Sequence, residues 1–285
     1  MVNVNKIQRD LNTYFRINGS VKIDPSTGVV DVDGDVDLIK SISHLPVKFG
    51  TVSGDFACLK KHLSSLVGAP SHVGRDFSVF ANTLTSLAGA PDHVGGDFYC
   101  ESNRIVSLVG APDHVGGNFN CSYNELTSLE GAPGHVDGYF ICAHNQLTNL
   151  VGAPDHVGDS FSCAYNQLES LEGAPGRVGG LFNCLRNQLT SLAGAPRYVD
   201  GDFSCSSNPL ESFAGAPDHV NGEFECSYSM SLPLLRLIVY SKVHIYDSPQ
   251  GLDDIINKYE GQGKPGALKA AAELIRAGYK ENARW

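Results

Sequence analysis

Apolar residues recur at fixed positions along most of the chain. In the stretch that begins at Val94 the pattern is V-x-G-x-F-x-C-x-x-N-x-I-x-x-L, and Gly-Ala-Pro follows it. The alternation of apolar and polar residues from Val94 to Cys100 predicts a short β-strand with one buried face. Gly-Ala-Pro recurs every 21 residues, ending at Pro70, Pro91, Pro112, Pro133, Pro154, Pro175, Pro196 and Pro217. This period lets the chain return and lay the next strand beside the first, so we predict a repeat solenoid.

Other positions of the repeat form columns with the same period. The Phe column contains Phe56, Phe77, Phe98, Phe119, Phe140, Phe161, Phe182, Phe203 and Phe224. All eight cysteines lie two residues after a Phe, at Cys58, Cys100, Cys121, Cys142, Cys163, Cys184, Cys205 and Cys226, and Val79 takes the remaining place. The Asn column contains Asn82, Asn103, Asn124, Asn145, Asn166, Asn187 and Asn208. We expect Phe and Cys to point inward, and the Asn amides to satisfy backbone groups at the turn after the strand.

The repeat resembles the leucine-rich repeat, L-x-x-L-x-L-x-x-N/C-x-L, with Phe and Cys at the two inward strand positions. This resemblance implies a leucine-rich-repeat solenoid with a one-strand-per-repeat parallel β-sheet. The recurring Pro excludes a long helix from the return, so we predict a convex side of turns and short 3₁₀ pieces. One repeat buries apolar side chains worth roughly 10 kcal/mol, against a backbone entropy cost of about 1–2 kcal/mol per residue. Repeats must therefore stack, and both ends need caps.

The two ends of the chain depart from the repeat. Residues 1–29 predict an N-terminal cap, with an amphipathic helix over residues 1–15 and a hairpin over residues 19–30. Residues 30–231 predict the repeats, with about ten strands and a degenerate first repeat in which Val32 stands 20 residues before Val52. Residues 232–285 predict a helical C-terminal cap. Its last helix places four residues on one apolar face over the last repeat, namely Leu268, Ala271, Ala272 and Ile275.

Three longer segments sharpen the resemblance. The opening VDVDGDV…LPVKFGTVSGDF, the units of the form LTSLAGAPDHVGGDF.C..N, and the closing IINKY…GALKAAAELIRAGYKENARW are similar to a family of leucine-rich-repeat proteins encoded by tailed bacteriophages. The resemblance covers nearly the whole chain. It implies a viral protein in the cytoplasm of the bacterial host, no catalytic residues, and a host or defence protein as the partner.

Composition and charge narrow the possible functions. With 31 acids against 21 Lys and Arg, the formal charge of −10 argues against direct nucleic-acid binding. No apolar run approaches the length of a membrane span, and the first 15 residues lack the apolar stretch of a signal peptide. We therefore expect a cytoplasmic protein without membrane contact, in which the cysteines are reduced.

The candidate chemical motifs favour structural interpretations. A metal–thiolate site needs four convergent sulfurs, whereas one cysteine per strand gives a line of thiols about 4.8 Å apart, so we predict no metal and no cofactor there. Residues 31–37 alternate Asp with Val or Gly, but Val36 and Ile42 stand where an EF-hand needs Gly and Glu, so we predict an edge strand. Residues 261–264 end in Gly-Lys like a P-loop, but the upstream Gly and the Ser or Thr after the Lys are missing. No catalytic motif is present, and we expect no enzyme.

A second column lies two residues after each Pro. It contains His72, His93, His114, His135, His156 and His219, with Arg177 and Tyr198 in two places. We expect these residues in the return turn, where preceding Asp residues such as Asp92 and Asp113 favour local capping chemistry. A metal-binding stripe and a response to pH are the alternatives.

The variable strand positions predict the binding surface. Because the regular columns point inward, the residues between them should point to solvent on the concave face. Exposed aromatic, aliphatic and Arg side chains are typical of binding hot spots. They concentrate at Tyr99, Tyr123, Tyr139, Ile141, His144, Tyr165, Leu181, Leu185 and Arg186. We therefore predict a non-enzymatic protein-binding scaffold that uses this face.

Two other functions remain open. The chain could be a structural or assembly component of the virion that uses the His column or the helical end. Alternatively, it could be an acidic mimic of nucleic acid that uses Asp55, Asp76, Asp97, Asp202, Glu223 and Glu225. The sequence leaves the oligomeric state and the target open.

Overall fold

The computed structural model describes residues 2–284, so that Met1 and Trp285, at the outer ends of the two predicted caps, lie outside it. The chain divides into two compact units. Unit 1 runs up to residue 146 and includes residues 152–156, and unit 2 comprises residues 147–151 and the chain from residue 157 onwards. Each unit is a parallel β-solenoid in which equivalent residues pair at a spacing of 21. The predicted period and parallel stacking are confirmed.

Unit 1 begins with a helix and a hairpin. Helix α1 (Val4–Tyr14) starts at Asn3, whose side-chain Oδ1 accepts a hydrogen bond from the backbone N–H of Lys6 at 2.9 Å. Strands β1 (Phe15–Ile23) and β2 (Val29–Leu38) pair antiparallel. The helix lies where the sequence predicts it, whereas the hairpin is longer than the predicted residues 19–30, because its strands run from Phe15 to Leu38. Their role as a cap stays a prediction.

Strand β2 is a central strand. It pairs with β1 on one side, and with β3 (Lys48–Val52) and β4 (Phe56–Ala57) in parallel on the other. Val32 pairs with Val52, which confirms the degenerate first repeat with its spacing of 20. The predicted edge strand at residues 31–37 is wrong, because the hairpin supplies a partner that alternation alone does not reveal.

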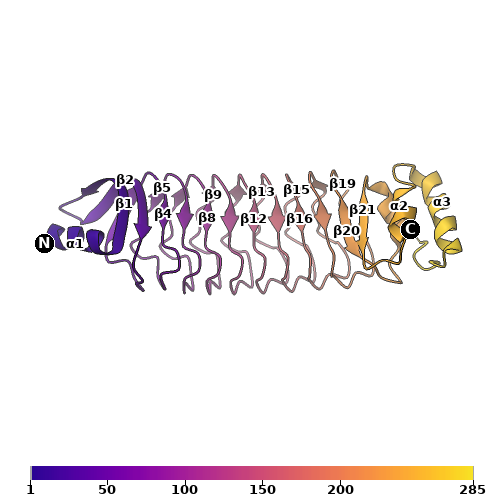
Figure 1. Cartoon of the computed structure of the whole chain (residues 1–285), viewed down its shortest axis with the longest axis horizontal. Helices are drawn as coiled ribbons and strands as arrows, with labels where there is room; N and C mark the ends of the chain where they lie inside the picture. The colour runs from indigo at the N-terminus through magenta and orange to yellow at the C-terminus, as the bar shows by residue number, and fades with distance from the viewer. Residues whose placement is uncertain (1, 285) are drawn as a thin grey trace. The chain divides into compact units, whose positions relative to one another are not determined.

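Each later turn contributes two short strands, which form two rows (Figure 1). In unit 1 the His row contains β5 (His72–Val73), β7 (His93–Val94), β9 (His114–Val115) and β11 (His135–Val136). Strand β13 (His156–Val157) lies at the unit boundary. In unit 2 the row contains β15 (Arg177–Val178), β17 (Tyr198–Val199) and β19 (His219–Val220). The Phe row has in unit 1 β4, β6 (Phe77–Ser78), β8 (Phe98–Tyr99), β10 (Phe119–Asn120) and β12 (Phe140–Ile141), and in unit 2 β14 (Phe161–Ser162), β16 (Phe182–Asn183), β18 (Phe203–Ser204) and β20 (Phe224–Ser227).

The prediction of one strand per repeat is therefore wrong. The segment from Val94 to Cys100 contains a bend at Gly95 and Gly96, so Val94 and Phe98 belong to different rows. Successive turns approach closely at this bend, where a Cβ atom on Gly95 would lie 2.3 Å from the carbonyl oxygen of Gly74. The two glycines permit the contact that breaks the strand.

The interior of each unit is built from the predicted columns. The Phe rings follow one another with centroid separations of 5.1–5.7 Å in unit 1 and 5.1–5.5 Å in unit 2. The Val, Cys and Leu columns are buried beside them. Each turn thus buries about five apolar side chains in register with those of the next.

The Asn column joins successive turns. The Asn124 side-chain N–H group donates to the carbonyl oxygens of Cys100 at 3.1 Å and Cys121 at 3.0 Å. Its Oδ1 accepts from the backbone N–H of Ile105 at 2.9 Å. Cys100 and Ile105 belong to the preceding turn. The expectation that these amides satisfy backbone groups at the turn is confirmed.

The remainder of each described repeat consists of turns and bends, without the predicted 3₁₀ pieces. Unit 2 ends with the 3₁₀ helix η1 (Leu234–Val239), strand β21 (Val243–Tyr246), and helices α2 (Leu252–Asn257) and α3 (Gly263–Arg276). Strand β21 pairs in parallel with β20 and so continues the Phe row. No helix among residues 2–284 is long and apolar enough to cross a membrane.

The buried face of α3 differs from the predicted one. Ala267, Ala270 and Leu274 are buried, whereas Leu268 is 68% and Ile275 is 53% exposed. The charged residues Lys269, Glu273 and Arg276 leave a broad apolar arc on this helix, so periodicity alone does not identify the packed part of that arc. The small residues permit close packing against η1 and α2.

Candidate functional site

Several predicted binding residues share an unusual backbone conformation. The residue four positions after a Phe has φ between +54° and +57° in eight turns, and we call this set the αL column: Lys60, Ala81, Ser102, Tyr123, His144, Tyr165, Arg186 and Ser207. Each lies just beyond the end of a Phe-row strand. Because the conformation recurs in eight successive turns, it belongs to the repeat architecture. The column gives each unit a set of side chains at regular intervals.

Aromatic and cationic side chains of this column contact one another. In unit 1, the rings of Tyr123 and His144 stack with centroids 4.1 Å apart and planes 11° apart, and Tyr123 is 55% exposed. In unit 2, the Arg186 guanidinium lies over the Tyr165 ring, 5.3 Å from its centroid. Tyr165 is 38% exposed. The structure thus brings four of the nine predicted residues together as two pairs.

Tyr99 and Tyr139 form a second contact in unit 1. The Tyr99 hydroxyl donates to Asp97 Oδ2 at 2.5 Å and lies 3.3 Å from the Tyr139 hydroxyl. Burial, followed by these hydrogen bonds, raises the pKa of Tyr99 well above its usual range. Both rings are half-buried, and their hydroxyls lie within hydrogen-bonding distance of each other.

The residues before each Phe form a hydrogen-bonded ladder in unit 1. The backbone N–H of Asp76 donates to Asp55 Oδ1 at 3.2 Å, and that of Asp97 donates to Asp76 Oδ1 at 2.9 Å. Asn118 and Tyr139 continue the series with donor–acceptor distances of 2.7 and 3.0 Å. The expectation that these residues only point to solvent is wrong, because their oxygens satisfy backbone groups of the next turn.

The three aliphatic residues of the predicted site lie in both units. Ile141 ends β12 of unit 1 and pairs with Asn120, while Leu181 and Leu185 flank β16 of unit 2. All three are half-buried. The Leu181 backbone N–H donates to Ser160 Oγ at 3.1 Å, which is the same ladder as in unit 1. The role of all nine residues in binding stays a prediction.

Glu101 is a potential binding residue that the sequence prediction omits. It is half-buried, its Oε2 is buried without a hydrogen-bond partner, and burial raises its pKa. The available signal is its charge. The other residues of unit 1 that lie two positions before an Asn of the Asn column are uncharged, as at Phe80 and Ser122. A buried carboxylate oxygen without a donor is costly, so Glu101 is an unusual polar position close in sequence to the predicted Tyr99.

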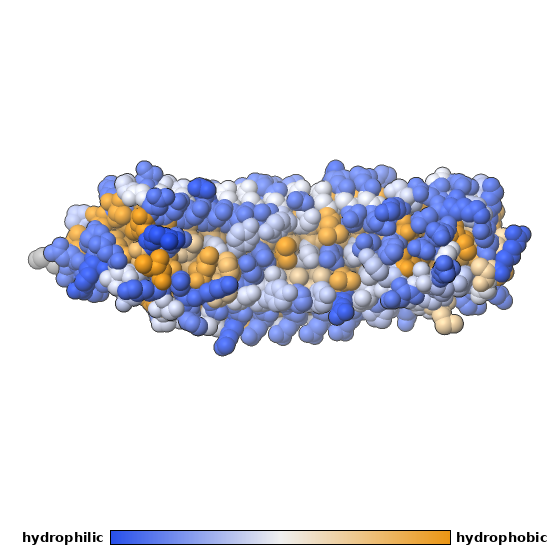
Figure 2. Space-filling view, in the orientation of Figure 1, coloured by the Kyte–Doolittle hydropathy of each residue, from blue (hydrophilic) through white to orange (hydrophobic). Residues whose placement is uncertain are grey.

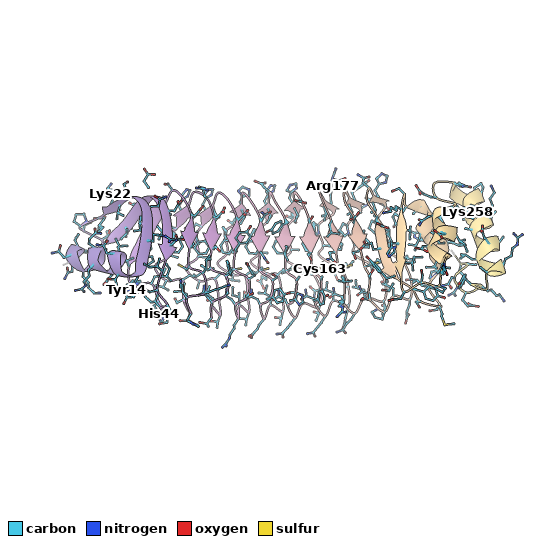
Figure 3. All side chains as sticks on the ribbon, viewed as in Figure 1. Tyr14, Lys22, His44, Cys163, Arg177 and Lys258 are labelled. Carbon is cyan, nitrogen blue, oxygen red and sulfur yellow. The ribbon has the colours of Figure 1, made fainter. Side chains whose placement is uncertain are left out.

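The His row forms a different surface. The first residue of each strand in this row is exposed, whereas the Val that follows it is buried. Arg177, which is labelled in Figure 3, points outward from the ribbon. The expectation of a return turn is wrong, because these residues pair as parallel strands. His72 and His93 stack with centroids 4.5 Å apart, and His135 and His156 with centroids 4.3 Å apart.

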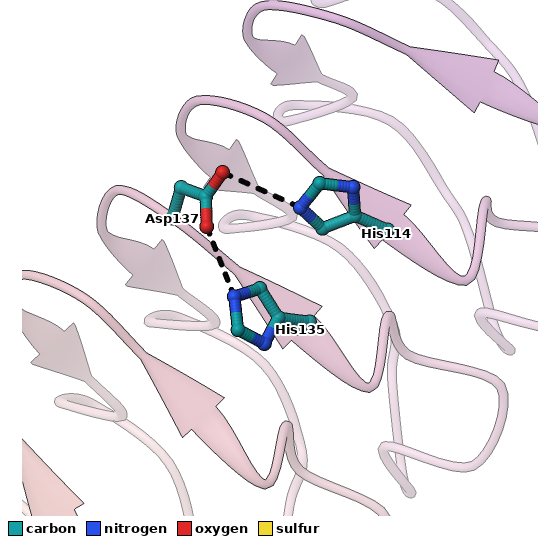
Figure 4. Close-up of side chains that lie close together, drawn as sticks. All are labelled: His114, His135 and Asp137. Atoms are coloured by element: carbon teal, nitrogen blue, oxygen red, sulfur yellow. Dashed lines mark hydrogen bonds and ion pairs between the residues drawn. The ribbon is translucent and has the colours of Figure 1, made fainter.

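Asp137 joins two members of the His row in unit 1 (Figure 4). Its Oδ2 lies 3.3 Å from His114 Nε2, and its Oδ1 lies 2.9 Å from His135 Nε2. Within residues 2–284, these three side chains form the one group of potential metal ligands whose atoms converge within 4.8 Å. Sequence reasoning missed Asp137. The signal was an Asp in a column that usually contains Gly, placed 2 and 23 residues after a His.

The cysteines offer no comparable group. All eight are buried. The Cys184 thiol donates to the carbonyl oxygen of Ser204 at 3.3 Å, and other thiols of the column make the same contact with the next turn. Burial raises the pKa of Cys226 to about 12 and those of several other thiols further. These features are typical of structural cysteines.

A groove lies beside α3 in unit 2. It has a volume of about 620 Å³ and is mainly apolar, with Leu235, Ala267, Leu268, Ala271, Ala283 and Lys264 along its sides. On the face shown in Figure 2, apolar residues lie in several separate groups among hydrophilic ones. This face therefore does not display a single extended apolar patch.

No family model matches this chain, and no curated protein matches it. The similarity to leucine-rich-repeat proteins of tailed bacteriophages therefore stays a prediction from the repeat and the terminal segments.

Proposed function

We propose that this chain is a non-enzymatic protein-binding scaffold. The observation that carries the proposal is the αL column, in which Tyr123 stacks on His144 in unit 1 and Arg186 packs over Tyr165 in unit 2. These side chains are exposed or half-buried. Tyr and Arg are the residues on which binding hot spots most often depend.

The backbone supports this use of the column. From Ala81 onwards, each αL-column residue precedes an Asn of the Asn column, which bonds to two turns as Asn124 does, so the side chains project from a fixed framework. Side chains that are held in place before binding lose less conformational entropy when a partner arrives. The neighbouring hydroxyls of Tyr99 and Tyr139 supply polar groups in unit 1.

The class of partner comes from the sequence resemblance. We propose a phage protein that acts in the bacterial cytoplasm by binding a host or defence protein through the outer side of the Phe row, the face that sequence reasoning calls concave. The acidic balance of the chain favours a partner with a basic surface.

Affinity capture tests the proposal. The immobilised full chain is exposed to a bacterial lysate, captured proteins are identified by mass spectrometry, and the purified partner is titrated against variants. Tyr123→Ala and Tyr165→Ala should each weaken binding about thirtyfold, as expected when an anchor worth about 2 kcal/mol is removed. The fold should persist, because Ala81 already occupies the same column with φ +55°.

Tyr198→Ala is the matched control. Tyr198 lies in the His row and is 45% exposed, so the variant removes an equally accessible aromatic ring from the other surface. The partner should bind this variant as it binds the unaltered chain. Loss of binding in Tyr198→Ala alone, or equal binding by all three variants, would show that the αL column is not the contact.

A second candidate is an assembly component of the virion, favoured by the exposed apolar groove beside α3. Leu268 lines the groove and is exposed, and an exposed apolar surface is typical of a contact between proteins. The candidate predicts concentration-dependent self-association in sedimentation velocity, abolished by Leu268→Lys. A monomer at all concentrations would argue against a contact between copies.

The acidic mimic is less well supported. Asp55, Asp76 and Asp97 accept backbone hydrogen bonds from the next turn, which explains their spacing without a partner. Capture of a nucleic-acid-binding protein that is released by moderate salt would favour the mimic.

A further inference from the structure

We infer that His114, His135 and Asp137 form a binding site for a divalent transition-metal ion such as Zn²⁺. The two imidazoles come from neighbouring strands β9 and β11, and the carboxylate follows β11 directly. The three ligand atoms lie within 4.8 Å of one another. This site is separate from the αL column, and the inference holds whichever surface binds a partner.

The distances suit coordination. In a tetrahedral zinc site with ligand bonds near 2.0–2.1 Å, neighbouring ligand atoms stand about 3.3 Å apart. His114 Nε2 lies 3.3 Å from Asp137 Oδ2, and His135 Nε2 lies 2.9 Å from Asp137 Oδ1. A small rotation of the carboxylate presents one of these oxygens to an ion that both imidazoles bind. All three side chains are about half exposed, so small rotations can open the contacts to admit an ion.

Asp137 departs from its column. Equivalent positions in other turns contain Gly95, Gly116 and Gly179, where an added Cβ would lie 2.0–2.4 Å from a backbone oxygen of the preceding turn. The same repeat also contains Gly134 where most repeats have an Asp before the His. The carboxylate is thus moved from one side of its His to the other, between two imidazoles.

Unit 2 contains an internal comparison. Asp200 occupies the same column as Asp137, but Arg177 and Tyr198 stand in place of the two histidines. Arg177 Nη2 lies 2.8 Å from Asp200 Oδ2, so that carboxylate is held by a permanent cation. An imidazole has a lone pair that a guanidinium lacks. Only the Asp137 arrangement therefore offers three ligand atoms.

The ligand set defines the class of ion. Two imidazoles with one carboxylate suit Zn²⁺ and neighbouring transition metals, whereas Mg²⁺ and Ca²⁺ prefer oxygen ligands. His156 stacks on His135 with planes 13° apart and so fixes the orientation of that ring. The remaining coordination positions face solvent, where water or a partner's side chain completes the shell.

Calorimetric titration with Zn²⁺ tests the site, using the full chain without a histidine tag. We expect one ion per chain with micromolar affinity. Asp137→Asn and His135→Ala should each weaken binding at least tenfold, because even outer-shell changes cost about 10–100-fold. Circular dichroism should show unchanged folding, since both side chains are exposed.

Two variants serve as controls. Asp200→Asn alters the same column beside Arg177, and the double variant His72→Ala with His93→Ala removes a stacked pair that has no joining carboxylate. Both should bind Zn²⁺ as the unaltered chain does. The inference is overturned if no Zn²⁺ binds at millimolar concentration, or if Asp137→Asn binds with full affinity. It is also overturned if Co²⁺ produces a thiolate charge-transfer band, which would assign binding to the cysteines.

Discussion

At the scale of the residue, the Asn column links successive turns. Replacing Asn124 with Ala leaves the Ile105 N–H without its acceptor, whereas the Cys100 and Cys121 carbonyls keep the amides of Asn103 and Asn145. An unsatisfied buried group costs about 1–3 kcal/mol, so we expect a loss of that order. The midpoint of urea unfolding measures the change. Asn5→Ala on the exposed face of α1 is the control. An equal shift of the urea midpoint in both variants would contradict this role of the Asn column.

Glu101 provides a residue-scale prediction for pH. Burial raises its pKa above the ordinary value of 4.5, so the native state holds its proton more tightly than the unfolded state does. The stability it contributes is therefore present below pH 4.5 and is lost as the pH rises through the folded pKa. Glu101→Gln, which stays neutral, should be more stable than the unaltered chain at pH 7.

Thermal unfolding from pH 4 to pH 7 measures this difference. The advantage of Glu101→Gln should shrink as the pH falls towards 4, where the carboxyl is protonated in both states. Glu125→Gln, at an exposed position of the next turn, should show no such trend. If Glu101→Gln is less stable at pH 7, the carboxylate has a favourable partner in solution.

At the scale of the element, the sequence specifies periodicity more completely than strand boundaries. Phe98 and Cys100 are buried as alternation predicts, because neither depends on where the strand ends. The division into two rows depends on the bend at Gly95 and Gly96, whose glycines fit a contact with the preceding turn. A contact between turns leaves no periodic signal within one repeat, so it was not predictable from alternation.

In the candidate site, too, periodicity predicts some contacts and not others. Tyr123 and His144 were predictable as neighbours because they lie 21 residues apart in one column. Tyr99 and Tyr139 are 40 residues apart and come from different columns, so only the structure reveals their contact. Asp137 was missed for a related reason, because its two histidines lie 2 and 23 residues before it. Sequence columns capture contacts along the stack but not contacts between columns.

At the scale of the whole molecule, the reactivity of the cysteine thiols measures the opening of each unit. Unit 1 contains Cys58, Cys100, Cys121 and Cys142, and unit 2 contains Cys163, Cys184, Cys205 and Cys226. All are buried, and desolvation raises the pKa of most of them strongly. We expect a thiol reagent to modify fewer than one thiol per native chain, and all eight in strong denaturant.

Labelling in intermediate denaturant should be more informative. In a solenoid each turn is stabilised by its neighbours, so loss of one turn exposes the adjoining ones and the cysteines of one unit should become reactive together. Mass spectrometry of partly labelled chains, followed by peptide mapping, measures this directly. Chains with modification confined to the four cysteines of one unit would show that the unit opens as a whole. Random single modifications spread over both units would contradict it, because each turn would then open independently of its neighbours.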